Sequence, residues 1–176
     1  MSNQDFLTRV EAAKSDIRDL TANISSIGTL HQKALSSPDS GSSQLEHLVS
    51  QTQILNTRIR DQIKFLETDA ARSGGNVTKD AQIRTLKQNF KTQLEEYQRE
   101  EQTYRQRYQE QIARQYRIVN PEATDEEVRE AANADWGDEG VFQTAVSALY
   151  SPVSSGNADS ARDSLRPTAV AMHLAS

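Results

Sequence analysis

The sequence contains no cysteine in its 176 residues, and glycine and proline are scarce, with seven and four residues respectively. The lack of cysteine excludes disulfides and cysteine-ligated metals, and it favours a reducing compartment. Apolar runs are also short: none reaches the roughly 18 residues of a membrane-spanning helix, and residues 1–10 lack the apolar core of a signal peptide. We therefore expect the chain to be soluble and cytosolic.

Residues that could carry out catalysis or bind a cofactor do not come together in this sequence. The three histidines stand at positions 31, 47 and 173, in separate segments, and no pair has a metal-ligand spacing. The sequence also has no glycine-rich phosphate-binding loop. It predicts neither an enzyme nor a metal or cofactor site, and the net charge of -5 argues against nucleic acid as a partner.

Three long segments carry apolar residues at steps of three and four, the spacing of one helix face. We predict helices over residues 3–35, 43–72 and 78–120, the last of which ends before Pro121. The first stripe consists of Phe6, Val10, Ala13, Ile17, Leu20, Ile24 and Ile27. The second stripe consists of Leu45, Leu48, Thr52, Leu55, Ile59, Ile63, Leu66 and Ala70. The third stripe consists of Ile83, Leu86, Phe90, Leu94, Tyr97, Tyr104, Tyr108 and Ile112.

The third helix is too long for a compact globule, because about 40 residues at 1.5 Å each would span roughly 60 Å. Loops of about five to eight residues cannot cross a rod of that length, so successive helices must run antiparallel. The predicted fold class is all-α, an elongated antiparallel up-down-up three-helix bundle over residues 1–120, which we expect to be a monomer in isolation. Ser43 and Glu46 have capping-box spacing at the start of the second helix, and Gly74 and Gly75 suit a left-handed cap at its end.

An acidic linker, residues 121–145, follows the bundle. Residues 79–120 carry nine lysines and arginines against six acids, whereas residues 121–139 carry eight acids and one arginine. The stretch Thr124-Asp-Glu-Glu127 is a capping box, which predicts a short helix over residues 124–134. A helix this short is marginal alone in water, so it must dock against the bundle or form only transiently.

The end of the sequence has little that could fold by itself. A glycine-broken segment contains Trp136, Val141 and Phe142. We interpret these side chains either as an anchor for a partner or as a cluster that folds back on the bundle end. Residues 146–176 are rich in serine and alanine without helical periodicity. We predict that they form a disordered tail.

Two features have both a structural and a functional interpretation. His31 continues the first stripe after Ile27, and it is either a bundle-end histidine with its polar edge in water or a pH switch. Arginines alternate with tyrosines in residues 103–108, a pattern that also occurs on surfaces that bind single-stranded RNA. The tyrosines share the apolar stripe, however, and this favours core positions over a stacking platform.

The segment Arg114-Gln-Tyr-Arg-Ile-Val-Asn-Pro-Glu-Ala-Thr124, together with Glu127, Asp5-Phe6-Leu7 and Leu30-His-Gln-Lys33, resembles syntaxins (Qa-SNAREs) of the fungal plasma-membrane Sso type. The resemblance covers about residues 3–145. It implies that the bundle is the regulatory N-terminal Habc domain, which in this family is followed by a linker, a SNARE helix and a C-terminal membrane anchor. Residues 146–176 do not resemble the linker or the SNARE helix.

The resemblance also implies a protein-interaction function in vesicle fusion and exocytosis, at the cytoplasmic face of the plasma membrane. Such a domain packs against a SNARE helix, slows assembly with SNAP-type and vesicle SNAREs, and binds SM-family regulators. A groove between the second and third helices could receive that helix, aided by basic residues. The candidates are Arg84, Lys87, Lys91, Arg105 and Arg114. The alternative is a structural coiled coil or a membrane-curvature module, because long amphipathic helices also bind anionic lipid, although the net charge of -5 opposes it.

Overall fold

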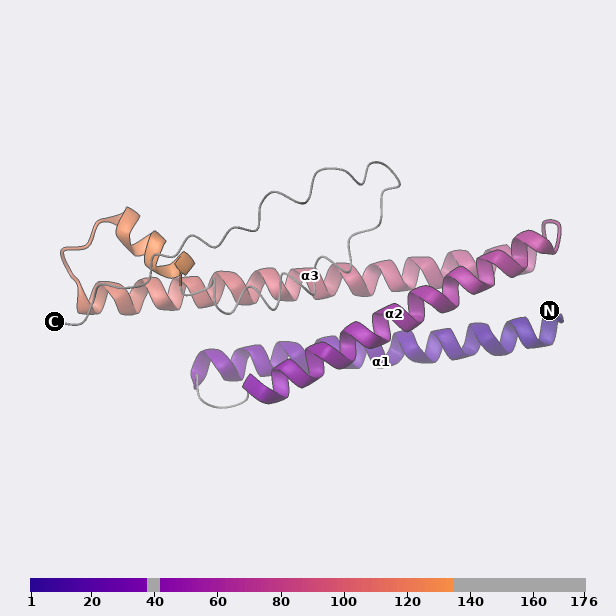
Figure 1. Ribbon diagram of the computed structural model, residues 1–176, viewed down its shortest axis with the longest axis horizontal. Coiled ribbons are helices and arrows are strands. Elements are labelled where there is room, and N and C mark those ends of the chain that lie inside the picture. Colours follow the sequence, from indigo (N-terminus) through magenta and orange to yellow (C-terminus); the bar gives the residue numbers. More distant parts are fainter. Residues whose placement is uncertain (38–41, 135–176) are drawn as a thin grey trace, which may run out of the picture.

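A computed structural model describes residues 1–37 and 42–134 of the chain. Three long helices form an elongated antiparallel bundle, namely α1 (Asn3–Ser36), α2 (Ser42–Arg72) and α3 (Val77–Val119) (Figure 1). The predicted all-α three-helix architecture is confirmed. None of the helices in the described ranges is long and apolar enough to span a membrane. Trp136, Val141, Phe142 and the tail 146–176 lie outside the described residues.

The first helix buries the stripe that its sequence predicts. Ser2 caps α1, because its side-chain oxygen accepts a hydrogen bond from the backbone N–H of Asp5 at 3.1 Å. Burial runs from Phe6 to Ile27 and continues one turn further to His31, whose side chain is only 2% exposed. The prediction that the polar edge of this histidine is in water is therefore wrong. α3 extends past the end of α1 (Figure 1), and its residues Glu100 and Tyr104 contact the imidazole.

The second helix buries a wider stripe than a strict heptad predicts. Val49 and Asn56 are buried in addition to the predicted residues, whereas Leu48 is only partly buried. Val49 and Asn56 are separated from Glu67 by nearly whole numbers of helical turns, so all three residues share one face of α2. The carboxylate of Glu67 accepts a hydrogen bond from Lys87 of α3 at 2.6 Å. Val49 and Asn56 therefore face α3, and they widen the buried face of α2 beyond its heptad stripe.

The capping residues predicted from the sequence are found at the C-terminal end of α2 but not at its N-terminal end. The predicted capping box at Ser43 is not formed at the helix start, because α2 begins at Ser42 and Ser43 lies within the helix. At the other end, Gly74 and Gly75 adopt φ angles of 68° and 87°, the left-handed geometry that glycine permits. Asn76 then caps α3, and its side-chain oxygen accepts hydrogen bonds from two backbone N–H groups of the first turn.

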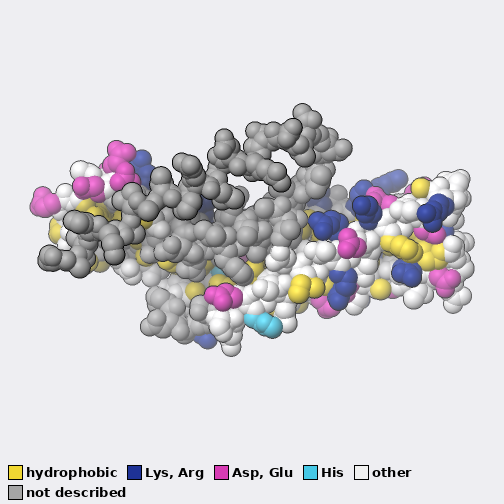
Figure 2. Space-filling view, viewed as in Figure 1, with side chains coloured by type: hydrophobic (Ala, Val, Ile, Leu, Met, Phe, Trp, Pro, Cys, Tyr) yellow, Lys and Arg dark blue, Asp and Glu magenta, His cyan; other side chains and the backbone are white. Residues whose placement is uncertain are grey.

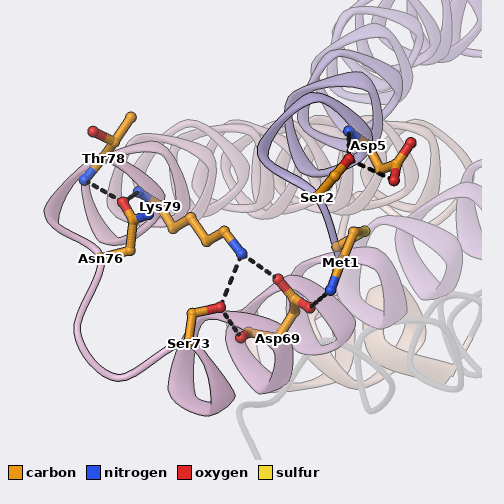
Figure 3. Close-up of polar contacts among 8 residues, drawn as sticks. All are labelled: Met1, Ser2, Asp5, Asp69, Ser73, Asn76, Thr78 and Lys79. Carbon is orange, nitrogen blue, oxygen red and sulfur yellow. Dashed lines mark hydrogen bonds and ion pairs between the residues drawn. The ribbon is translucent and has the colours of Figure 1, made fainter.

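Three helix ends meet at the carboxylate of Asp69 (Figure 3). It accepts a hydrogen bond from Nζ of Lys79 at 2.7 Å and lies 3.3 Å from the amino group of Met1. The same Lys79 Nζ donates to Oγ of Ser73 at 2.9 Å and lies 5.0 Å from the ring centroid of Phe6. Lys79 can therefore be 4% exposed despite its charge. The hydrogen bond from Lys79 lowers the pKa of Asp69.

The third helix extends beyond the ends of the other two (Figure 1). It has 43 residues, against 34 in α1 and 31 in α2, so its last turns project beyond the three-helix core. After a turn at residues 120–123 the chain forms a further helical segment, residues 125–134, which we call the return helix. The return helix runs back along the projecting end of α3.

Candidate interaction surface

The seam between α2 and α3 is the most open of the three helix contacts. α1 packs along both other helices, whereas α2 and α3 touch each other much less. A three-helix arrangement with one open seam can accept a fourth helix there, because the missing helix would complete a four-helix bundle. This is where the sequence places its candidate groove.

Four of the predicted basic residues share the side of α3 that borders this seam. Arg84, Lys87 and Lys91 follow one another at helical steps of three and four, and Arg105 stands two heptads after Lys91. All four side chains are exposed. Lys87 fixes the direction, because its ammonium group bonds to Glu67 on α2. We call these four residues the basic edge.

Arg114, the fifth predicted residue, lies on the other side of α3. It is about two and a half turns beyond Arg105, which places the two side chains on opposite faces. Arg114 instead lines a cavity of about 440 Å³ together with Leu35 of α1 and Ile118. The structure therefore does not bring it together with the basic edge, since the sequence argument weighed charge without following the rotation of the helix.

The walls of the seam combine apolar and polar side chains. Val49 and Asn56 come from α2, and Leu94 of α3 lies two turns after Lys87, partly buried against the core. Asn56 is 4% exposed, and neither atom of its side-chain amide has a hydrogen-bond partner. Sequence reasoning missed both α2 residues, although an asparagine beside a heptad stripe is a recognisable signal of a polar layer.

The tyrosines of α3 occupy core positions. Tyr97 and Tyr104 are buried, and Tyr108 is half-buried with its ring centroid 6.1 Å from that of Tyr104. A surface that stacks nucleic-acid bases needs exposed rings. The core interpretation of residues 103–108 is therefore the one that fits the structure.

The return helix docks on the projecting end of α3. Its predicted capping box forms: Glu127 donates its backbone N–H to Oγ1 of Thr124 at 3.2 Å, and its carboxylate accepts the N–H of Thr124 at 2.8 Å. Val128 and Ala132 are buried. Figure 2 shows acidic side chains gathered at this end of the molecule.

Two polar contacts fix the direction of the return helix. Arg117 of α3 donates to Asp125 at 2.8 Å, and Gln109 donates to Asn133 at 2.9 Å. The two helices are therefore antiparallel. The predicted anchors that follow, Trp136, Val141 and Phe142, lie beyond the described residues. Within the described ranges, no three histidine or acidic side chains group as metal ligands would.

Comparisons with known proteins agree with this architecture. A sequence model of the family described as Syntaxin matches residues 2–146. The chain is 28% identical to Syntaxin-like protein psy1 of Schizosaccharomyces pombe, over 83% of this chain and 54% of that protein. It is 27% identical to Protein SSO1 of Saccharomyces cerevisiae, over 80% of this chain and 49% of that protein. It is 31% identical to Protein transport protein SSO2 of Candida albicans, over 82% of this chain and 52% of that protein.

The chain thus spans about half the length of the curated relatives it matches. Among solved structures, it is similar to a chain of the Unc18-syntaxin 1 complex from Monosiga brevicollis, with a TM-score of 0.67 and 20% identity. That likeness covers 85% of this chain and 75% of the other. At this identity it shows a shared fold. The resemblance to fungal syntaxins that the sequence indicated is confirmed.

Proposed function

The chain belongs to the syntaxin family, and from that premise we propose that its bundle is the regulatory domain of a t-SNARE that acts in vesicle fusion. Members of this family are SNARE proteins and not enzymes, in agreement with the lack of any catalytic constellation in the sequence. The bundle, over residues 1–120, would control assembly of the SNARE complex by packing against a SNARE helix. The acidic linker, residues 121–145, would connect it to that helix.

The observation that carries this proposal is the open seam between α2 and α3 with its basic edge. An amphipathic helix laid into the seam would bury its apolar face against the partly buried Leu94 and Phe90. Acidic side chains on the helix would meet Lys87 and Lys91 at the rim. Rim charges of this kind mainly accelerate encounter, so the basic edge should affect the rate of docking more than its final strength.

We further propose that an SM-family regulator binds the docked form. The similar fold in the Unc18-syntaxin 1 complex supports this partner class. SNAP-type and vesicle SNAREs would be the partners once the SNARE helix leaves the seam. The site of action would be the cytoplasmic face of the plasma membrane, as expected for relatives of the fungal Sso type.

The proposal is tested by association of the full chain with the SNARE helix of a fungal relative, supplied as a separate peptide. The double variant Lys87→Glu/Lys91→Glu should associate at least several-fold more slowly at low salt and show a flatter salt dependence. Its melting temperature should stay within a few degrees, because both side chains are more than half exposed.

A matched control is the double variant Arg18→Glu/Lys33→Glu, which makes the same charge change at exposed positions of α1. If the control slows association as much as the basic-edge variant, net charge and not the seam is responsible. If the wild-type chain binds the peptide and neither variant changes the rate, the helix docks elsewhere. Saturable, salt-sensitive binding to anionic liposomes without peptide binding would instead favour a membrane-curvature module.

A further inference from the structure

A buried histidine links α1 to α3 at the end of the bundle opposite Asp69. The ring of His31 stacks on the ring of Tyr104, with centroids 3.9 Å apart and an interplanar angle of 4°. Its Nδ1 lies 3.1 Å from Oε1 of Glu100, whereas its Nε2 is buried without a hydrogen-bond partner. The side chain is 2% exposed, so Nε2 is shielded from bulk solvent.

Gly28 makes the approach of Glu100 possible. A Cβ atom at this position would lie 3.2 Å from Cδ of the Glu100 side chain, closer than ordinary contact. Gly28 lies one turn before His31 on the same face of α1, so a larger residue would push the carboxylate away from the imidazole. Glycine is unfavourable inside a helix, and here it leaves room for the close approach of a charged group from α3.

The surroundings of His31 suit its neutral form. With Nδ1–H donated to Glu100, Nε2 of the neutral ring is an acceptor without a donor. A second proton would be costlier, because it would add a positive charge and an N–H without an acceptor. Burial lowers the pKa of His31, and the hydrogen bond and negative charge of Glu100 oppose this only in part.

The other titratable groups near His31 come from α3. Its direct contacts are Glu100 and Tyr104, and the neighbouring Glu101 is a further carboxyl buried on the same helix, 8% exposed. From α2 the described contacts contain no ion pair or hydrogen bond to the imidazole. Asp16 pairs with Arg58, and antiparallel packing therefore brings His31 level with the start of α2, where the buried side chain is the apolar Leu45.

We propose that His31, Glu100, Tyr104 and Gly28 form an acid-sensitive latch that holds the C-terminal half of α1 against α3. The neutral imidazole keeps the latch closed. A proton taken up at Nε2 creates a buried N–H without an acceptor and a charge whose desolvation Glu100 offsets only in part, and the end of α1 is then released from α3 to reach water. The latch is a conformational device that does not depend on what the seam binds.

The direction of the pH effect follows from linkage. The pKa of His31 is lower in the closed latch than in the open one, so the open form binds a proton more readily. The contribution of His31 to stability is therefore complete above its ordinary pKa of 6.5. That contribution is lost as the pH falls from there through the lower folded-state pKa. Uptake of one proton on opening raises the opening equilibrium by up to about tenfold for each pH unit in this window.

The opening is confined to one end of the bundle. At the opposite end, the hydrogen bond from Lys79 lowers the pKa of Asp69 below its ordinary 3.8, so that contact stays ionised in mild acid. As the pH falls below 6.5 into mild acid, the latch weakens while the Asp69 contact holds. α1 should therefore open from its C-terminal end while its N-terminal end stays docked.

Native-state hydrogen exchange of the full chain between pH 5 and 7.5, corrected for intrinsic exchange rates, tests this proposal. In the wild type, the opening equilibrium of amides in residues 24–36 should rise up to about tenfold per pH unit below pH 6.5, while residues 66–86 keep their protection. His31→Gln keeps a neutral donor toward Glu100 and should abolish this pH dependence. His47→Gln, at an exposed histidine of α2, should leave it unchanged.

Two further measurements keep the proposal testable if the His31 variant does not fold. NMR titration of the wild-type His31 ring should give a pKa below the ordinary 6.5, and a value at or above 6.5 would overturn the latch. In Glu100→Gln the loss of protection should extend to lower pH, because the variant lacks the negative charge that favours the imidazolium. The proposal would also be contradicted if amides at both ends of the bundle lost protection equally in acid. An equal loss of amide protection in wild type and His31→Gln would contradict it as well.

Discussion

Two isoleucines in α2 give a direct test of the helix register that the whole bundle depends on. Ile59 is 0% exposed and lies in the core cluster, whereas Ile54, five residues earlier, is 68% exposed. Replacing Ile59 by alanine deletes about three buried carbon atoms, worth roughly 0.8 kcal/mol each, and leaves a cavity. The free energy of unfolding should therefore fall by about 3 to 4 kcal/mol.

The same change at Ile54 should cost less than about 1 kcal/mol, since most of that side chain is in water in the folded state. Urea unfolding followed by circular dichroism measures both values, and the Ile59→Ala chain should also melt roughly 10 °C lower. Ile59→Asp should be worse still, because the carboxylate would be buried without a partner. If Ile54→Ala proves as costly as Ile59→Ala, the assignment of buried faces on α2 is wrong.

Two further outcomes are expected. Thr124→Ala removes the cap of the return helix and should destabilise its docking by about 1 kcal/mol; faster amide exchange in residues 125–134 alone would show this, and an unchanged rate would contradict a docked helix. Asp69→Asn should lower the urea midpoint at pH 7, because Lys79 loses its counter-charge, and the gap to wild type should close as the pH falls below 3.8 through the depressed pKa of Asp69. A gap that persists unchanged at pH 2.5 would refute the role given to that carboxylate.

The sequence predicted the core of α1 well because that helix presents one narrow stripe to its neighbours. An unbroken alternation of three and four from Phe6 to Ile27 leaves only one possible buried face. α2 was harder, since it buries Val49 and Asn56 outside its heptad stripe. Periodicity finds the centre of a buried face better than its width.

The candidate site was predictable in composition but only partly in geometry. Steps of three, four and fourteen residues keep the basic edge together, and the same counting places Arg114 on the opposite side. The burial of Lys79 against Asp69 and the burial of His31 beneath α3 depend on where separate helices end. Contacts of that kind join residues distant in the chain, and a local sequence pattern carries no signal for them.

The direction of the return helix sets where the rest of the polypeptide starts. From Val119 back to Gln109, the contact point of Asn133, is about 15 Å along the α3 axis at 1.5 Å per residue. The last described residues of the return helix therefore lie beside α3 near Gln109 and not at its far tip. A segment that is covalently attached at this point through a tether has a high effective concentration at nearby surfaces when the tether is short. Modest intrinsic affinity would then suffice for intramolecular pairing. A separate molecule competing for the same surface would have to exceed that concentration, and lengthening the tether would shift the competition in its favour.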